Sequence, residues 1–184
     1  LSGAFADAPV EAARGFRAAL SAMARPGRIE TVSGAIAPAP CSTAAAVLLL
    51  TLCDPETPLY LAPDHDTGAI REWIAFHIGA PLVPAKDARF ALGTWDALKP
   101  HDAYPLGTPD YPDRSATLIV ETETLEPQGP RLTGPGIETE ARLTLPETAF
   151  FRENRKRFPL GLDLFLTCGD RLAAIPRTTR VEDS

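Results

Sequence analysis

Apolar segments of helix length alternate with apolar segments of strand length over the first half of this chain, and this alternation limits the folds open to it. The first helix is indicated by apolar residues on one face of a 3.6-residue period: Val10, Ala13, Phe16, Leu20 and Met23. Pro9 suits its first turn, and the Arg-Pro-Gly segment 25–27 ends it. Ser42 is placed to cap a second helix that runs to about Cys53; it is apolar on every face, so we expect it to be buried. Thr67 is placed to cap a third helix, whose inward stripe is Ile70, Trp73, Ile74 and His77.

Strands are expected between and after these helices, and a fourth helix is expected late in the chain. The predicted strands span residues 28–32, 58–61, 89–92, 116–123, 131–133, 141–145, 162–167 and 172–175, and the fourth helix spans 146–158. Helices and strands alternate early, whereas hairpins dominate late. This order predicts an α/β fold with a mixed sheet and helices on both faces, which makes three layers. At 184 residues, without a linker or repeat, the chain is expected to form one domain over residues 1–184.

Composition and charge exclude several classes of protein. The chain is 45% hydrophobic and 23% charged, as globular proteins are. No apolar run approaches the ~20 residues of a membrane span, and no signal-peptide pattern opens the chain. Three cysteines without CxxC spacing favour a reducing compartment, so we expect a cytoplasmic protein that does not contact a membrane. A net charge of −6 disfavours nucleic acid as a partner.

Familiar catalytic and cofactor motifs are missing from the sequence. There is no GxxxxGK[ST], GxGxxG, GxSxG or HExxH pattern, and no Cys/His cluster, so no metal is expected. Lysine is scarce, at Lys86, Lys99 and Lys156, and none lies where a strand end meets a Gly/Ser loop. A pyridoxal phosphate enzyme needs one such lysine, so we expect no such cofactor.

Two segments carry groups that suit an anionic ligand. In the turn 131–137, backbone N–H groups at Gly134 and Gly136 and the Thr133 hydroxyl are able to form an anion nest, although a purely structural turn is favoured. The second segment places Arg177 beside Thr178 and Thr179, a set that suits phosphate or carboxylate because arginine offers a planar fork. The alternative is a solvated strand face or a subunit contact.

The remaining candidates are one acid and a group of interface residues. Asp163 has apolar neighbours on both sides; we expect it to be paired with an arginine or to cap backbone N–H groups, with general-base duty as the less favoured alternative. The segment 100–113 is a long loop rich in Pro, Gly, Asp and Tyr, and such loops are often functional. Interface candidates, chosen by residue type, are His77, Tyr104, Tyr111, Asp113 and Arg114.

Six ordered segments resemble the PhnH family of the bacterial carbon–phosphorus lyase machinery. They are FRAALSAMARPG (16–27), LLLTLCDPETPLYL (48–61), FHIGAPLV (76–83), YPLGTPDYPDRSATLIVE (104–121), RLTGPGI (131–137) and FPLGLDLFLTCGDRLAAIPRTTRVE (158–182). The resemblance covers essentially the whole chain. It implies a part in attaching an alkylphosphonate to C1 of a ribose triphosphate with displacement of adenine from ATP, while a partner subunit is associated with the glycosidic cleavage.

The resemblance also carries expectations about fold and assembly. It implies a fold like the large domain of pyridoxal-phosphate-dependent aminotransferases without the cofactor, a homodimer, and membership of a multi-subunit core complex. It provides no secure catalytic residue. Two hypotheses follow: a required subunit that is not catalytic alone, or a subunit that binds phosphonate or ribose phosphate and contributes directly to the active site.

Overall fold

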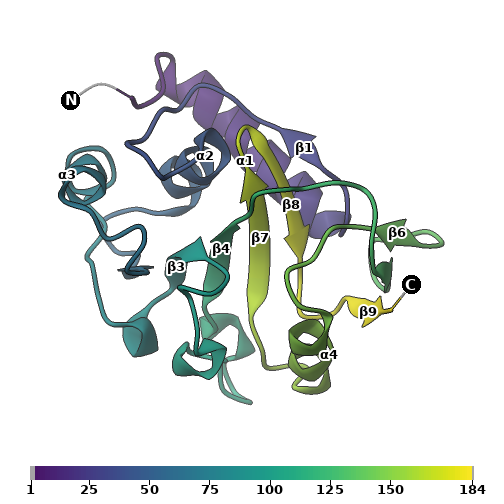
Figure 1. The fold of residues 1–184 in the computed structure, drawn as a ribbon. Coiled ribbons are helices and arrows are strands. Elements are labelled where there is room, and N and C mark those ends of the chain that lie inside the picture. The colour runs from purple at the N-terminus through teal and green to yellow at the C-terminus, as the bar shows by residue number, and fades with distance from the viewer. Residues whose placement is uncertain (1–2, 184) are drawn as a thin grey trace.

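The computed structural model describes residues 3–183, which form a mixed six-stranded sheet, a small second sheet and four α-helices (Figure 1). From edge to edge, the main sheet contains β1 (Glu30–Thr31), β8 (Arg171–Ile175), β7 (Asp163–Cys168), β4 (Thr117–Glu121), β3 (Phe90–Thr94) and β2 (Leu59–Leu61). The second sheet contains β6 (Ala141–Arg142), β5 (Arg131–Thr133) and β9 (Arg180–Glu182). The helices are α1 (Ala8–Ala24), α2 (Thr43–Leu52), α3 (Gly68–His77) and α4 (Thr148–Lys156).

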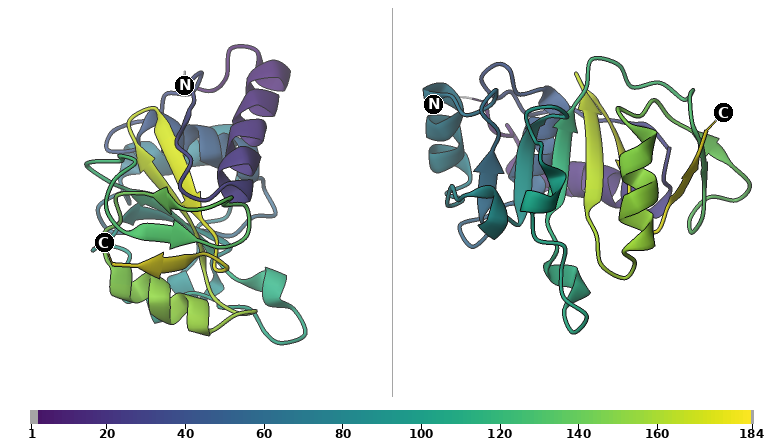
Figure 2. Two further views of the ribbon diagram at one scale, coloured as in Figure 1. Left: turned by 90° about the vertical axis from the view of Figure 1, so that its right-hand side faces the viewer. Right: turned by 60° about the horizontal axis from the view of Figure 1, so that its bottom comes forward.

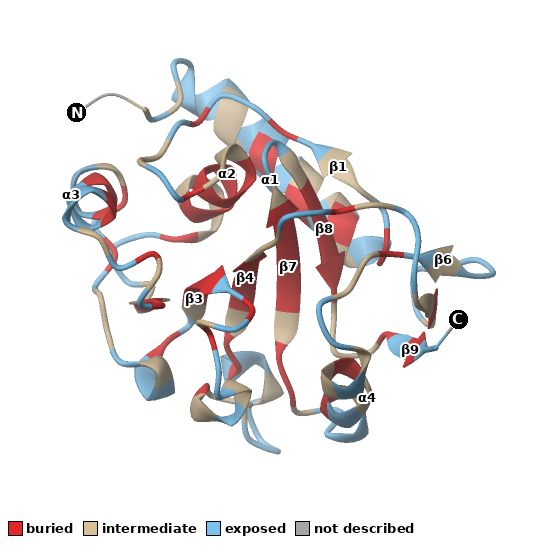
Figure 3. Cartoon of the chain, in the orientation of Figure 1, coloured by how far each residue is buried: buried red, intermediate tan, exposed pale blue. Residues whose placement is uncertain are grey.

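Four strands of the main sheet run parallel. β2, β3, β4 and β7 pair in this way, with Leu118 of β4 opposite Leu164 of β7, and β8 then returns antiparallel to β7. Parallel strands are covered on both faces and therefore consist of near-continuous apolar runs. β4 and β7 follow this rule, because their central residues are buried throughout (Figure 3).

Two hydrophobic cores lie on opposite faces of the sheet, which confirms the expected mixed sheet with helices on both sides. On one face, Ile119 and Phe165 pack with residues of α1, α2 and α3. On the other, Leu118 and Leu164 pack with α4 and with the second sheet. The alternation of side chains along each strand thus divides the core into two layers. Figure 2 shows α1 and α4 on opposite sides of the strands.

The helix predictions are confirmed, and so are two of their caps. The hydroxyl of Ser42 accepts a hydrogen bond from Ala45 N, and that of Thr67 accepts one from Ile70 N. α2 is buried nearly all round, as expected from its apolar sequence. The inward stripe of α3 is correct for its first three members, whereas His77 is only half-buried.

Of the apolar face that periodicity identifies in α1, only Met23 packs against the core; the other four residues are exposed. Phe16 and Leu20 are 52% and 58% exposed. The buried side consists of the small residues Gly15, Ala19 and Ala22. A Cβ at Gly15 would lie 2.7 Å from Val47 Cγ1, so the glycine allows α1 to approach α2 closely.

The C-terminal segment forms one strand that the sequence does not predict. β9 pairs antiparallel with β5, and β5 also pairs with β6. Two predicted elements are shorter in the structure. The strand predicted at 141–145 is β6 (Ala141–Arg142), and the helix predicted at 146–158 is α4 (Thr148–Lys156). Within residues 3–183, no helix is both long enough and apolar enough to cross a bilayer.

Candidate functional site

The four parallel strands end at the same edge of the sheet, and this edge carries a cluster of polar side chains. In open α/β sheets, ligands bind in the crevice outside the carboxyl ends of the strands. Here β2 is followed by Asp64 and His65, β3 leads into Thr94–Asp96, and β4 ends at Glu121. The fold therefore brings together residues that are widely separated in sequence.

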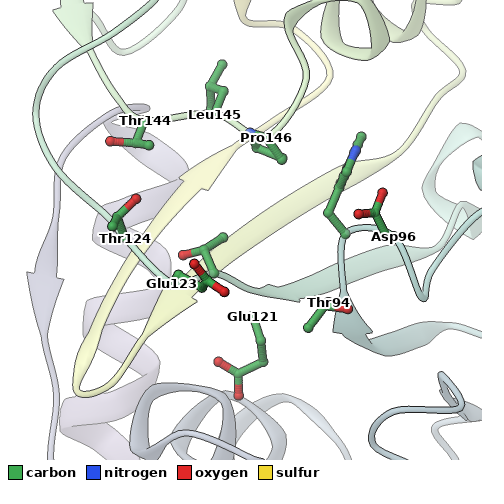
Figure 4. A pocket seen from close by; sticks show the side chains of 10 residues that line it. Thr94, Asp96, Glu121, Glu123, Thr124, Thr144, Leu145 and Pro146 are labelled. Atoms are coloured by element: carbon green, nitrogen blue, oxygen red, sulfur yellow. The ribbon is translucent and has the colours of Figure 1, made fainter.

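Glu121 is the most firmly held acid at this edge. Its carboxylate accepts hydrogen bonds from Ser42 N (2.6 Å) and from the Thr167 hydroxyl (2.8 Å), and its side chain is 10% exposed. The N-terminus of α2 thus points toward a carboxylate, as the helix dipole favours. In Figure 4, Glu121 points away from Thr144, Leu145 and Pro146. Glu121 therefore holds the N-terminus of α2 against the end of β4.

His65 is buried beside two carboxylates. Its Nδ1 lies 3.0 Å from Asp64 Oδ1 and its Nε2 lies 4.0 Å from Glu121 Oε1, yet neither ring nitrogen has hydrogen-bond geometry to a described residue. Burial raises the pKa of Asp64, but the hydrogen bond from Thr94 N and the proximity of His65 together lower it by more, so that the pKa lies below its ordinary value. With its side chain 2% exposed, His65 has no open path to a ligand in this conformation.

A cavity of about 480 Å³ lies at this edge, between the strand ends and the segment before α4 (Figure 4). Its lining consists of Thr94, Trp95, Asp96, Glu121, Thr122, Glu123, Thr124, Thr144, Leu145 and Pro146. Three carboxylates and four threonines belong to this lining, although the Glu121 carboxylate is turned toward Ser42 N, and none of these ten residues is cationic. Such a lining repels a phosphate or phosphonate and suits a neutral hydroxyl-bearing or cationic group.

An aromatic cluster supports one wall of this cavity. The indole N–H of Trp95 donates to Glu147 Oε2 (3.1 Å), and its ring lies 3.9 Å from that of His101. Phe150 and Phe151 of α4 pack against the same indole. Burial is the main cause that lowers the pKa of His101. The cluster packs α4 against the residues that follow β3, beside the cavity.

The residues predicted from sequence lie elsewhere, and Asp163 and Arg177 prove to be partners. Asp163 begins β7 and Arg177 follows β8, which places both at the opposite edge of the sheet. Arg177 Nη2 lies 2.6 Å from Asp163 Oδ2, and Arg177 N donates to Asp163 Oδ1 (2.8 Å). The guanidinium also donates to Ser115 Oγ and to the carbonyl of Pro112. The favoured prediction for Asp163, an arginine pair, is confirmed.

The two predicted anion-binding segments lie side by side. Thr133 of β5 is opposite Arg180 of β9, and a Cβ at Gly134 would lie 3.2 Å from Thr178 O. Gly136 sits against the end of α1, where a Cβ would lie 2.0 Å from Ala24 O. Thr179 is buried, and its hydroxyl has no partner among the described residues. Close packing accounts for both glycines, and anion binding by this turn stays a prediction.

The interface candidates divide into exposed and buried residues. Tyr111, Asp113 and Arg114 are exposed, and the guanidinium of Arg114 lies 3.9 Å from the Tyr111 ring centroid. Their loop projects from the body of the molecule (Figure 2, right). His77 is half-buried against Trp73 and Phe76. Tyr104 is 4% exposed and donates its hydroxyl to Leu98 O, which leaves little of it to offer another chain.

Sequence reasoning missed Asp64, His65 and Glu121. Each follows or ends an apolar strand, which is the one local signal that marks them. Their convergence depends on the parallel order of β2, β3 and β4, and no local pattern reveals that order.

A family comparison accounts for the whole described chain. Residues 3–182 match the family model of PhnH, described as a bacterial phosphonate metabolism protein. The chain belongs to the PhnH family. It is 43% identical over 190 residues to "Alpha-D-ribose 1-methylphosphonate 5-triphosphate synthase subunit PhnH" of Rhizobium meliloti (strain 1021), an alignment that covers 98% of this chain and 95% of that protein.

A second relative is more distant. The "Putative C-P lyase subunit protein HtxG" of Stutzerimonas stutzeri is 29% identical over 174 residues, covering 90% of this chain and 83% of the relative. Both relatives are named as subunits. The PhnH resemblance drawn from six segments is therefore confirmed over nearly the full length.

Proposed function

We propose that the chain is a subunit of a bacterial carbon–phosphorus lyase complex and takes part in forming alpha-D-ribose 1-methylphosphonate 5-triphosphate from ATP and methylphosphonate. The observation that carries this proposal is the full-length relationship to a synthase subunit, at 43% identity. In this reaction a phosphonate oxygen forms a bond to C1 of the ribose, the bond from C1 to adenine breaks, and adenine leaves with a proton.

The chain alone is proposed to be non-catalytic. The cavity at the strand ends has an anionic lining, which opposes a triphosphate or phosphonate, and the histidine at this edge is 1% exposed. Arg177 is already occupied by contacts within the chain. We therefore propose that groups from other subunits complete the site that acts on these two anionic substrates.

Adenine release tests this proposal. The purified chain, the remaining subunits without it, and the reconstituted complex are each incubated with ATP and methylphosphonate, and adenine is measured by chromatography. We expect adenine only from the reconstituted complex. Release by the isolated chain would refute the non-catalytic role, and undiminished release without this chain would refute its participation.

An alternative is that this subunit binds phosphate or phosphonate directly, near Thr133 and Thr178. The observation in its favour is that both predicted segments meet there, beside the unpaired hydroxyl of Thr179. Titration calorimetry with ATP, ribose 5-phosphate and methylphosphonate tests it, with Thr178→Val as the variant and Thr148→Val as a control distant in sequence. Absence of heat for all three ligands, alone and in the complex, would rule it out.

Assembly, location and cofactor complete the proposal. We infer a homodimer in the absence of other subunits, and a cytoplasmic location, consistent with the use of ATP and with three free cysteines.

We also propose a fold related to the large domain of pyridoxal phosphate aminotransferases, supported by the parallel strands β2, β3, β4 and β7 next to an antiparallel β8. No pyridoxal phosphate is expected to bind, and addition of the cofactor should produce no Schiff-base absorbance.

A further inference from the structure

The outer face of α1 combines exposed apolar side chains with free arginines. We define this outer face of α1 as the apolar residues Val10, Ala13, Phe16 and Leu20 with the flanking Arg14 and Arg17. Val10, Phe16 and Leu20 are 45%, 52% and 58% exposed. An amphipathic helix ordinarily turns its large apolar residues toward the core, but here Gly15, Ala19 and Ala22 take that place. The left view of Figure 2 shows α1 along the outside of the molecule.

Two arginines of this face lack an ion-pair partner in the described part of the chain. Among residues 3–183, neither Arg14 nor Arg17 forms an ion pair or hydrogen bond through its side chain. With Arg28 and Ser21 they line a shallow hollow of about 320 Å³ beside the apolar stripe. Arg28 is partly neutralised by Glu30, at 2.8 Å, and Glu30 also accepts from Ser21. The face is thus positive in a chain whose net charge is −6.

We infer that the outer face of α1 docks an acidic surface of another protein subunit, with an apolar strip on that subunit meeting Phe16 and Leu20. Apolar anchors surrounded by charge are the usual composition of an interface, in which the anchors supply affinity and the charges supply orientation and rate. Arginine also forms the bidentate pair that a carboxylate-rich partner requires. The inference rests on the proposed function insofar as it takes the partner from the same complex.

A second copy of this chain fits the face less well. In a two-fold dimer through this face the same positive patch meets itself, which brings the arginines of the two copies to one contact. Like charges at such a contact oppose association. A membrane surface is also disfavoured, since anionic lipid would attract the arginines but repel the rest of a chain with 24 acidic residues.

Two double variants test the inference by association with the remaining subunits of the complex. Phe16→Glu/Leu20→Glu should weaken binding at least tenfold, because charge is placed within the apolar contact. Arg14→Glu/Arg17→Glu should slow association about tenfold at low salt and remove most of its salt dependence. Arg14→Lys/Arg17→Lys should retain most of the rate. Phe76→Glu is the matched control, because Phe76 is 64% exposed on α3, and it should leave binding unchanged.

The measurements are surface plasmon resonance for binding, circular dichroism for folding, and light scattering for mass. Folded variants that bind like the wild type would overturn the inference. A wild-type chain that fails to join the other subunits would instead refute the proposed function. Two further results would overturn the inference of an acidic protein partner. One is self-association of the wild type that is lost in Phe16→Glu/Leu20→Glu. The other is binding of the wild type, but not of this variant, to phosphatidylglycerol/phosphatidylethanolamine vesicles. If the glutamate variant unfolds, Phe16→Ser/Leu20→Ser replaces it.

Discussion

Arg177 joins three separate segments of the chain through one guanidinium group and its backbone N–H. It contacts Asp163 in β7, Ser115 before β4 and the carbonyl of Pro159. The side chains of the Arg177–Asp163 pair are only 12% and 25% exposed. A charge pair that is this enclosed stabilises mainly because neither member is left alone.

Arg177→Ala should lower the free energy of unfolding by about 3 kcal/mol, because a partly buried carboxylate loses its partner. Arg177→Lys should fall between this variant and the wild type, since it keeps the charge but loses the fork. Urea denaturation in the absence of ligand measures both. Arg180→Ala is the control: Arg180 is exposed, and its removal should change stability by less than about 0.5 kcal/mol. An unchanged free energy of unfolding in Arg177→Ala would show that the fold does not need this arginine, which could then serve a ligand.

The three cysteines should react with a thiol reagent in two groups. Burial, followed by the nearby Asp54 carboxylate, raises the pKa of Cys53 to about 12. Burial likewise raises the pKa of Cys41. At pH 8 both should remain protonated and shielded, whereas the half-exposed Cys168 should react first. The native chain should therefore release one equivalent of thionitrobenzoate quickly and three in denaturant; fast release of all three would contradict the burial.

At the scale of elements, the turn 134–137 (Gly-Pro-Gly-Ile), which follows β5 in the chain, packs against the end of α1. Gly136 has φ +82°, and a Cβ there would lie 2.0 Å from Ala24 O. Gly136→Ala should therefore cost more than about 3 kcal/mol, as strain and a backbone clash combine. Gly169→Ala is the matched control, because φ is +61° there but nothing lies within 4 Å of the added atom. It should cost about 1–2 kcal/mol. Equal losses of thermal stability would show that close packing at Gly136 is not what the turn requires.

The same turn shows where sequence reasoning stops. Glycines at 134 and 136 mark a tight turn in any reading of the sequence, and the turn is present. Whether such glycines serve an anion or a close approach depends on what lies opposite them. The partner of Gly136 is α1, whose last residue is Ala24, more than a hundred residues earlier in the chain.

At the scale of the whole molecule, one sheet separates two cores. The strands contribute side chains to both, for example Ile119 to one and Leu118 to the other. Damage to either core therefore disturbs the strands that support the other. We expect a single cooperative unfolding transition, with far-ultraviolet and near-ultraviolet circular dichroism coinciding. Two separated transitions would show that the chain contains more than one folding unit.

The outer face of α1 and the carboxyl edge of the sheet both depend on how distant segments of the chain pack together. Periodicity identified Phe16 and Leu20 as part of one apolar face, but the small residues on the other side pack more closely on α2. Asp64, His65 and Glu121 attract no notice in sequence, because three parallel strands must be aligned before they meet.

Most of the local elements, though not β9, and the family could be predicted from the residues alone. Periodicity and caps such as Ser42 and Thr67 act over a few residues, and six ordered segments were enough to indicate a PhnH-type chain. Three features became visible in the folded chain alone: Arg177 pairs with Asp163, α1 presents most of its large apolar side chains to solvent, and an acidic cavity forms at the strand ends. These features differ in how far apart in sequence the interacting residues lie. Hydrogen-bonded turns and caps depend on neighbouring residues, whereas burial and charge pairing depend on segments that meet only after the sheet has formed.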